Sequence, residues 1–230
     1  VKSILFAAKN NGIPIRIGVN LGSLEKDIEA KYGLTPKAMV VSALKSIKFF
    51  EANDFNNIIV SLKASNVPDM IEANKIFSRN SDYPLHLGVT ESGTLVNGSI
   101  KSSLGIGNLL YEGVGDTIRV SLSADVVEEI KVAKCILQSL KIRRFGLEVT
   151  SCPHVQELIL MWKCASQIEK LTNKPLHIAV MGCSVNGPGE AKIADIGVVG
   201  GKDACLLYVE GEIVKKISKE SIIDEVRKYL

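Results

Sequence analysis

The first part of the chain repeats one pattern four times: a short apolar run followed by a helical stretch. The apolar runs are bounded by turn residues, as buried strands usually are, and they cover 13–19, 57–62, 85–90 and 117–122. Helical segments follow them at 36–53, 67–78, 99–112 and 126–140, and another opens the chain at 1–11. Strands that are apolar throughout and alternate with helices predict a parallel sheet covered on at least one face.

The pattern changes after about residue 141. Strands are expected at 144–150, 176–181, 194–199, 204–209 and 212–217, with helices at 155–171 and after Ser218. Glu210-Gly211 is a predicted hairpin turn between the last two strands. Three strands in close succession indicate an antiparallel or mixed sheet. We therefore expect two domains, an α/β domain over 1–141 and a smaller α+β domain over 142–230.

Composition excludes several classes of protein. The 230 residues are 46% hydrophobic and 23% charged, which is typical of a globular chain and excludes disorder. A net charge of +3 is too small to indicate nucleic-acid binding. No apolar run approaches the ~20 residues of a membrane helix, and no secretory signal opens the chain. Five scattered cysteines do not resemble a disulfide scaffold.

Polar residues follow each strand of the repeated pattern. They are Asn20, Lys63-Ala-Ser65, Thr90-Glu91 and Ser121-Leu-Ser123. The carboxyl ends of parallel strands are where α/β folds place their sites, so a ligand site is expected there. The alternative is that these residues simply begin solvated loops.

A second candidate site surrounds two cysteines. Cys183 follows a strand and enters the segment Ser-Val-Asn-Gly-Pro-Gly-Glu, while Cys152 ends another strand and precedes Pro153. Thiolates beside a Gly-Pro loop suit an iron–sulfur cluster better than zinc. The alternative is that both cysteines are small hydrophobes at strand ends. The remaining three, Cys135, Cys164 and Cys205, are expected in the core.

These motifs, at 13–26, 84–91, 115–122, 127–132, 182–191 and 194–197, resemble the bacterial-type 4-hydroxy-3-methylbut-2-en-1-yl diphosphate synthases. These are iron–sulfur enzymes of the non-mevalonate isoprenoid pathway. The resemblance implies the C-terminal half of a TIM-type (β/α)8 barrel followed by an α+β cluster domain. It implies a [4Fe-4S] cluster held by three cysteines and a glutamate. The implied reaction opens the ring of 2-C-methyl-D-erythritol 2,4-cyclodiphosphate and removes a hydroxyl with two electrons.

The resemblance also implies partners and a location. A reduced flavodoxin or ferredoxin would supply the electrons, and a homodimer is expected. The location would be the cytoplasm of a bacterium or a plastid-type organelle.

The resemblance assigns roles to individual residues. The implied cluster ligands are Cys152, Cys183 and Glu190, and the implied catalytic groups are Glu91 and Glu190. The implied substrate-binding residues are Arg16, Asn20, Lys63, His86, Arg119, Ser121 and Asn186. Arginine and lysine suit phosphate oxygens. The alternatives are an internal salt bridge for Lys63 and Arg119, and a core position for His86.

Two features depart from the family pattern. The family reads Cys-Pro-x-Cys-Gly-Arg where this chain has Val155 in place of the second cysteine, and His154 lies one position away. In addition, four strand–helix units make half a barrel, which would leave unpaired edges and an open apolar face. We therefore expect either a fragment or an oligomer. The functional alternative is an inactive or divergent fragment that binds diphosphates without a complete cluster.

Overall fold

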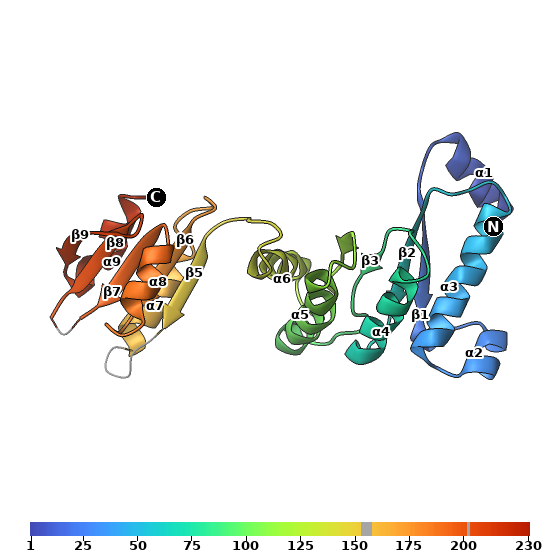
Figure 1. Ribbon diagram of the computed structural model, residues 1–230, viewed down its shortest axis with the longest axis horizontal. Coiled ribbons are helices and arrows are strands. Elements are labelled where there is room, and N and C mark those ends of the chain that lie inside the picture. Colours follow the sequence, from blue (N-terminus) through green and yellow to red (C-terminus); the bar gives the residue numbers. More distant parts are fainter. Residues whose placement is uncertain (153–157, 202) are drawn as a thin grey trace. The chain divides into compact units, whose positions relative to one another are not determined.

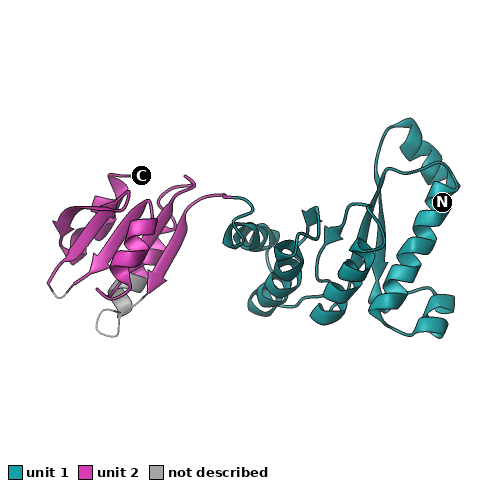
Figure 2. Cartoon of the chain, viewed as in Figure 1, with its two compact units in different colours: residues 1–143 teal, residues 144–230 magenta. Residues whose placement is uncertain are grey.

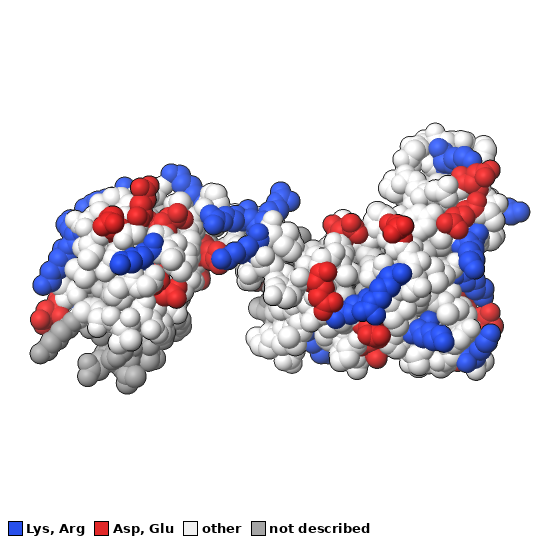
Figure 3. Space-filling view, viewed as in Figure 1, with Lys and Arg blue, Asp and Glu red and all other residues white. Residues whose placement is uncertain are grey.

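The computed structural model describes residues 1–152, 158–201 and 203–230, which form two compact units. The units comprise Val1–Arg143 and Arg144–Leu230 (Figures 1 and 2). Within the described ranges, none of the helices has the length and apolar character needed to cross a membrane. On the face drawn in Figure 3, both signs of charge occur on each unit.

The first unit repeats strand and helix in the predicted order. Its elements are α1 (Lys2–Asn10), β1 (Ile15–Asn20), the 3₁₀ turn η1 (Leu21–Ser23), α2 (Lys26–Tyr32), α3 (Pro36–Glu51), β2 (Ile58–Lys63), α4 (Val67–Ser78), β3 (His86–Leu87), α5 (Leu95–Tyr111), β4 (Thr117–Ile118) and α6 (Val126–Ser139).

The strands of this unit lie in chain order and run parallel. β1 pairs with β2 from Ile15 opposite Ile58 to Asn20 opposite Lys63. A parallel bridge from Val60 joins β2 to the segment before β3, which in turn pairs with β4. In the part of the chain that the structure describes, these strands do not close into a barrel. The expectation of a half-barrel arrangement therefore agrees with an open row of four strands.

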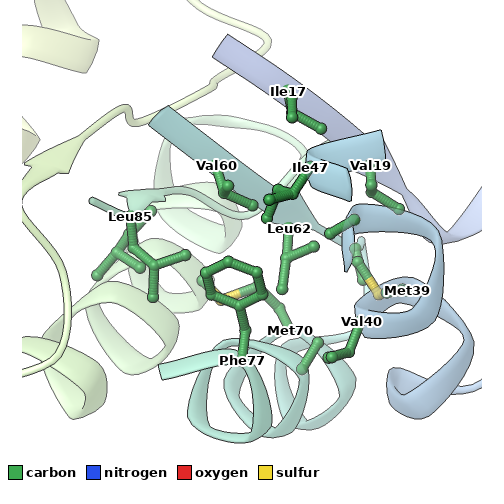
Figure 4. Close-up of a cluster of buried hydrophobic side chains, with 14 of the residues drawn as sticks. Ile17, Val19, Met39, Val40, Ile47, Val60, Leu62, Met70, Phe77 and Leu85 are labelled. Atoms are coloured by element: carbon green, nitrogen blue, oxygen red, sulfur yellow. The ribbon is translucent and has the colours of Figure 1, made fainter. Parts of the chain in front are cut away.

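The two faces of this row differ in chemistry. Alternate strand residues, including Ile17, Val60 and Leu62, are buried against α3 and α4 together with Met39 and Phe77 (Figure 4). Residues of the opposite parity point to the face without helices. They are Arg16, Gly18, Asn20, Ile59, Ser61, Lys63, His86, Gly88, Thr117 and Arg119. The expected open apolar face is therefore wrong, because most of these positions carry polar side chains, and Ile59 is the one large apolar residue among them.

Side-chain caps explain where two helices of this unit begin. Thr35 accepts a hydrogen bond from the Ala38 N–H at 3.2 Å and so caps α3, with Pro36 in its first turn. Asn66 caps α4 in the same way through the Asp69 N–H at 3.1 Å.

Two helices of this unit differ from the prediction. α5 begins at Leu95 rather than at 99, and its Gly105 is buried against Val89 and Met70. Gly105 therefore serves close packing, whereas a Cβ at Gly107 of the same helix would meet no atom within 4 Å. α2 was not predicted.

The second unit is a five-stranded sheet with helices on both faces. Its elements are β5 (Glu148–Cys152), α7 (Leu158–Ile168), β6 (His177–Met181), α8 (Gly187–Ile193), β7 (Ile196–Gly200), β8 (Cys205–Val209), β9 (Glu212–Ile217), the 3₁₀ turn η2 (Lys219–Ser221) and α9 (Ile222–Arg227). β5, β6 and β7 are parallel, whereas β8 and β9 continue the sheet antiparallel. The sheet is mixed, as the three closely spaced strands predict.

Several details of this unit refine the sequence prediction. Glu210 and Gly211 both have positive φ, 50° and 82°, and join β8 to β9 as the predicted hairpin turn. β5 begins at Glu148, four residues later than expected. The predicted start of α7 at Val155 lies outside the described residues. Ser218 precedes η2 rather than capping α9, and its side chain makes no capping bond.

Candidate functional site

The open face of the first unit gathers basic side chains from all four of its strands. Arg16 lies on β1, Lys63 ends β2, His86 begins β3 and Arg119 follows β4. The strand register sets Asn20 opposite Lys63 and His86 opposite Thr117. Because parity places these side chains on the same face, residues more than 100 positions apart come together there.

The electrostatics of Lys63 and His86 confirm this proximity. Burial, followed by the charges of Arg119 and Arg16, lowers the pKa of Lys63 from 10.5 to about 8. Burial, followed by the charges of Lys63, Arg16 and Arg119, lowers the pKa of His86 from 6.5 to about 4. His86 is therefore neutral at pH 7, whereas the three other groups form a cluster of positive charge.

No carboxylate neutralises this cluster within the described ranges. None of Arg16, Lys63 and Arg119 forms an ion pair there, and no acidic group acts on the pKa of Lys63 or His86. The alternative of an internal salt bridge for Lys63 and Arg119 is therefore wrong for the described chain. Lys63 is partly buried, while Arg16 and Arg119 are exposed. A partly buried cation without a counter-charge is costly, and the two exposed guanidinium groups add to the positive potential, so the cluster is suited to an anion.

Gly88 sets the position of the Lys63 ammonium. A Cβ at Gly88 would lie 2.7 Å from the Arg119 carbonyl oxygen and 3.2 Å from Lys63 Nζ. Both values are closer than normal contact, so any larger residue would displace the strand or the lysine. The glycine lets β3 approach β4 while leaving room for the ammonium group.

His86 has one satisfied ring nitrogen and one unsatisfied ring nitrogen. Its Nδ1 lies 2.9 Å from Thr117 Oγ1, within hydrogen-bond distance. Its Nε2 is buried and has no partner. The alternative of a core histidine with a satisfied ring is therefore wrong. A buried polar atom normally has a hydrogen-bond partner, so Nε2 is free to form a hydrogen bond with a ligand.

The other predicted residues of this unit lie at or beyond the carboxyl ends of the strands and have different surroundings. Asn20 Oδ1 accepts a hydrogen bond from the Gly22 N–H at 3.0 Å, so its oxygen caps η1. Ser121 accepts a hydrogen bond at its backbone oxygen from the Ser92 hydroxyl. Glu91 is exposed and adopts a positive φ of 52°, a conformation that is uncommon outside glycine.

The second unit brings the two predicted cysteine ligands to adjacent strand ends. Cys152 is the last residue of β5 and is paired with Met181 of β6, two residues before Cys183. The Cys152 carbonyl accepts a hydrogen bond from the Gly182 N–H at 2.8 Å. Cys152 is exposed and Cys183 is partly exposed, so the alternative of buried strand-end hydrophobes does not hold.

A short helix follows Cys183 where the sequence predicted a loop. The backbone N–H groups of Asn186, Val185 and Gly187 surround the Cys183 thiol and lower its pKa. Glu190 lies in the first turn of α8, and its backbone N–H donates to the Asn186 carbonyl at 3.1 Å. Asn186 is exposed and makes no side-chain cap.

The donor chemistry suits part of an iron–sulfur site. The thiolate-stabilising backbone around Cys183 and the neighbouring Cys152 match the needs of iron. However, no group of three His, Cys, Asp or Glu side chains within 1–152, 158–201 and 203–230 is gathered closely enough to hold a metal. Val155 and His154 lie outside these ranges. The described residues therefore do not assemble a complete ligand set.

The other three cysteines divide into core and surface. Cys164 and Cys205 are buried, as predicted, and burial raises the pKa of Cys164. Cys135 is exposed on α6, so its predicted core position is wrong.

Comparison with protein families identifies both units. Residues 1–134 match the GcpE TIM-barrel domain, and residues 148–230 match the GcpE protein C-terminal domain. The chain belongs to the GcpE family. This confirms the predicted resemblance over nearly the whole chain.

Curated relatives of this GcpE chain carry one name. Proteins of Caldanaerobacter subterraneus subsp. tengcongensis and Clostridium acetobutylicum are 53% and 51% identical to it over its full length. A protein of Shouchella clausii is 50% identical over the same extent. Each is named 4-hydroxy-3-methylbut-2-en-1-yl diphosphate synthase (flavodoxin). The chain spans 64–67% of the length of these relatives, or about two thirds.

Sequence reasoning missed two residues of this GcpE site. Gly88 and Thr117 were not singled out, although each touches a predicted site residue. Thr117 lies two positions before Arg119, so strand parity alone would have placed it on the open face. The role of Gly88 has no comparable signal, since it depends on how closely β3 approaches Lys63.

Proposed function

We propose that this GcpE chain belongs to an enzyme that reduces 2-C-methyl-D-erythritol 2,4-cyclodiphosphate to 4-hydroxy-3-methylbut-2-enyl diphosphate in isoprenoid biosynthesis. The reaction consumes two electrons and two protons, opens the ring and releases water. The observation that carries this proposal is the cluster of Arg16, Lys63 and Arg119, none of which forms an ion pair with a carboxylate of the described residues. The synthase name of the relatives supports it.

The charge of the site matches a diphosphate. Two arginines and a lysine offer several N–H donors to phosphate oxygens, and charge-assisted hydrogen bonds are the strongest of their kind. A bound polyanion would also offset the burial and the charges of Arg119 and Arg16 that lower the pKa of Lys63. In this proposal Asn20, Ser121 and His86 line the same pocket, so residues 1–141 form the substrate-binding domain.

Glu91 is proposed as a proton donor or orienting group at this site. It follows Thr90, whose N–H donates to the Ala64 carbonyl at 3.2 Å. That bond places the Glu91 loop beside the end of β2, one residue after Lys63. An exposed carboxylate at this strand end lies at the correct edge of the sheet for a ligand held by Lys63.

The proposed electron-transfer group is a [4Fe-4S] cluster in residues 142–230. Cys152, Cys183 and Glu190 would hold it, with Asn186 beside the substrate and Glu190 as a catalytic group. Such a cluster supplies electrons and a Lewis-acidic iron when it is bound. The two thiols at neighbouring strand ends and the lowered pKa of Cys183 support this assignment.

The proposed partners follow from the relatives and from the chemistry. The relatives' name contains flavodoxin, so a reduced flavodoxin is the proposed electron donor, with ferredoxin as the other donor class. A homodimer and a location in the bacterial cytoplasm or a plastid-type organelle complete the proposal.

Anaerobic reconstitution with iron and sulfide tests the redox part. We expect bound iron and sulfide, visible cluster absorption, and turnover of the cyclodiphosphate with reduced flavodoxin. Cys152→Ser and Cys183→Ser should each lose iron. Cys135→Ser is the matched control, because Cys135 is an exposed cysteine in the other unit.

Calorimetry with the cyclodiphosphate tests the binding part separately. Binding without bound iron would instead support a divergent protein without a complete cluster. Absence of both binding and iron would contradict the proposed function.

A further inference from the structure

The pair formed by His86 and Thr117 links two adjacent strands on the open face, where Lys63, Arg16 and Arg119 act on the His86 ring. The two residues are direct register partners on β3 and β4, and their side chains meet at 2.9 Å between Nδ1 and Oγ1. A threonine hydroxyl can donate or accept, so the contact is compatible with either neutral form of the imidazole. The surroundings of the other nitrogen decide between the two forms.

Nε2 is buried, without a partner, in a cationic environment. The charged groups acting on His86 are Lys63, Arg16 and Arg119, and all three are positive. A positive environment favours a lone pair on the ring nitrogen and disfavours an N–H dipole directed at the cations. The proton of the neutral imidazole is therefore best placed on Nδ1, where the Thr117 hydroxyl accepts it.

We propose that Thr117 is a positioning residue that accepts the Nδ1–H of His86 and keeps Nε2 as a bare hydrogen-bond acceptor within the basic cluster. Thr117 acts through His86 and needs no contact of its own with a ligand. The pairing fixes both the orientation of the ring and the position of its single proton.

This arrangement divides the site into two kinds of recognition. The guanidinium and ammonium groups donate to phosphate oxygens, whereas an Nε2 lone pair accepts only from a donor. The ligand group that matches His86 is therefore a hydroxyl and not a phosphate oxygen. This assignment rests on the proposed function for the ligand, but the position of the proton is a property of the free chain.

Nitrogen NMR of ¹⁵N-histidine-labelled chain tests the proposal directly. Protonated and bare imidazole nitrogens have well-separated ¹⁵N shifts, and His86→Gln identifies the His86 signals among the three histidines of the sequence. At pH 7 we expect a protonated Nδ1 and a bare Nε2. A protonated Nε2 in the wild-type chain would overturn the proposal.

Two substitutions separate positioning from simple packing. Thr117→Val keeps the shape but removes the acceptor, so the His86 nitrogens should move toward averaged shifts. Thr117→Ser restores the hydroxyl and should restore the wild-type pattern. Unchanged His86 shifts in Thr117→Val would refute the positioning role, while the wild-type spectrum remains decisive if that variant does not fold.

The second unit provides a matched internal control. His177 meets Thr150 Oγ1 through its Nε2 at 2.9 Å, which is the opposite ring nitrogen. Thr150→Val should therefore move the His177 signals and leave those of His86 unchanged.

Sulfate tests the hydroxyl assignment, because it offers only acceptors. Adding sulfate to the labelled chain should leave the His86 proton on Nδ1. Transfer of that proton to Nε2 would overturn the hydroxyl assignment. Loss of synthase turnover alone would bear on the proposed function and would leave the tautomer result intact.

Discussion

Lys63 makes anion binding by this chain depend on pH in a range where no other member of its cluster titrates. Its pKa is lowered to about 8 by burial and by Arg119 and Arg16, while that of His86 lies near 4. Arginine remains charged throughout. An anion binds more tightly to the ammonium form of Lys63 than to the neutral amine. The affinity for the anion is therefore highest well below pH 8 and falls as the pH rises through 8.

The size of this effect follows from the fraction of charged Lys63. With a pKa of about 8, roughly nine tenths of the lysine is protonated at pH 7 and roughly one tenth at pH 9. The Kd of an anion that requires the ammonium should therefore rise about tenfold between these values. Sulfate is a suitable probe, because it remains a dianion over the whole range.

Methyl-detected NMR can follow this titration at pH 9, where amide protons exchange too fast. Ile59 lies on β2 opposite Arg16 of β1, and its side chain is on the same face of the sheet as that of Lys63. Its methyl signals therefore report on the open face. Lys63→Arg should make the Kd independent of pH, because a guanidinium stays charged. Lys45→Arg, at an exposed lysine paired with Asp27, should keep the wild-type slope. A pH-independent wild-type Kd, or the same slope in Lys63→Arg, would refute the reasoning.

Three further predictions concern packing and backbone conformation. Phe77→Ala removes a fully buried ring, so the free energy of unfolding measured with urea should fall by about 3–5 kcal/mol. A Cβ in Gly88→Ala would lie 2.7 Å from the Arg119 oxygen, so this variant should lose about 1–3 kcal/mol and bind sulfate more weakly. Its control, Gly107→Ala in a helix with no atom within 4 Å of the new Cβ, should gain about 0.5–1 kcal/mol. Gly211→Ala, at a φ of 82°, should cost about 1–2 kcal/mol by the same assay, and an unchanged midpoint would contradict the turn assignment.

Periodicity and caps predict most elements of this chain, because both signals are local. The helix expected at 67–78 is α4, with those bounds, since Asn66 supplies its cap and Pro68 lies in its first turn. Strand length is less predictable. β3 and β4 each contain two residues, although the apolar runs are six residues long. An apolar run indicates that a segment is buried. The length of a strand depends instead on whether the backbone hydrogen bonds between neighbouring strands continue, and between β3 and β4 they end at Leu87 and Ile118.

The site was predictable as a set of residues but not as an electrostatic state. The resemblance to the family named Arg16, Lys63, His86 and Arg119, and strand parity places them on one face. The lack of a carboxylate partner among the described residues depends on side chains from every strand. The partnerless Nε2 of His86 depends in turn on the pairing of β3 with β4. These properties are not local, so the sequence contains no short pattern for them.

The segment after Cys183 shows why composition can mislead about a site. Three glycines and a proline within 182–189 favour a loop, yet residues 187–193 form α8. Gly187 and Gly197 instead permit close packing, since a Cβ at Gly197 would lie 2.4 Å from the Cβ of Ala191, and one at Gly187 would lie 2.6 Å from Val199. The glycines thus hold the helix tightly on the sheet. The first turn of α8, which carries Glu190, is therefore held in place on β6 and β7. An iron ion bound by Glu190 would have its position set by this packing.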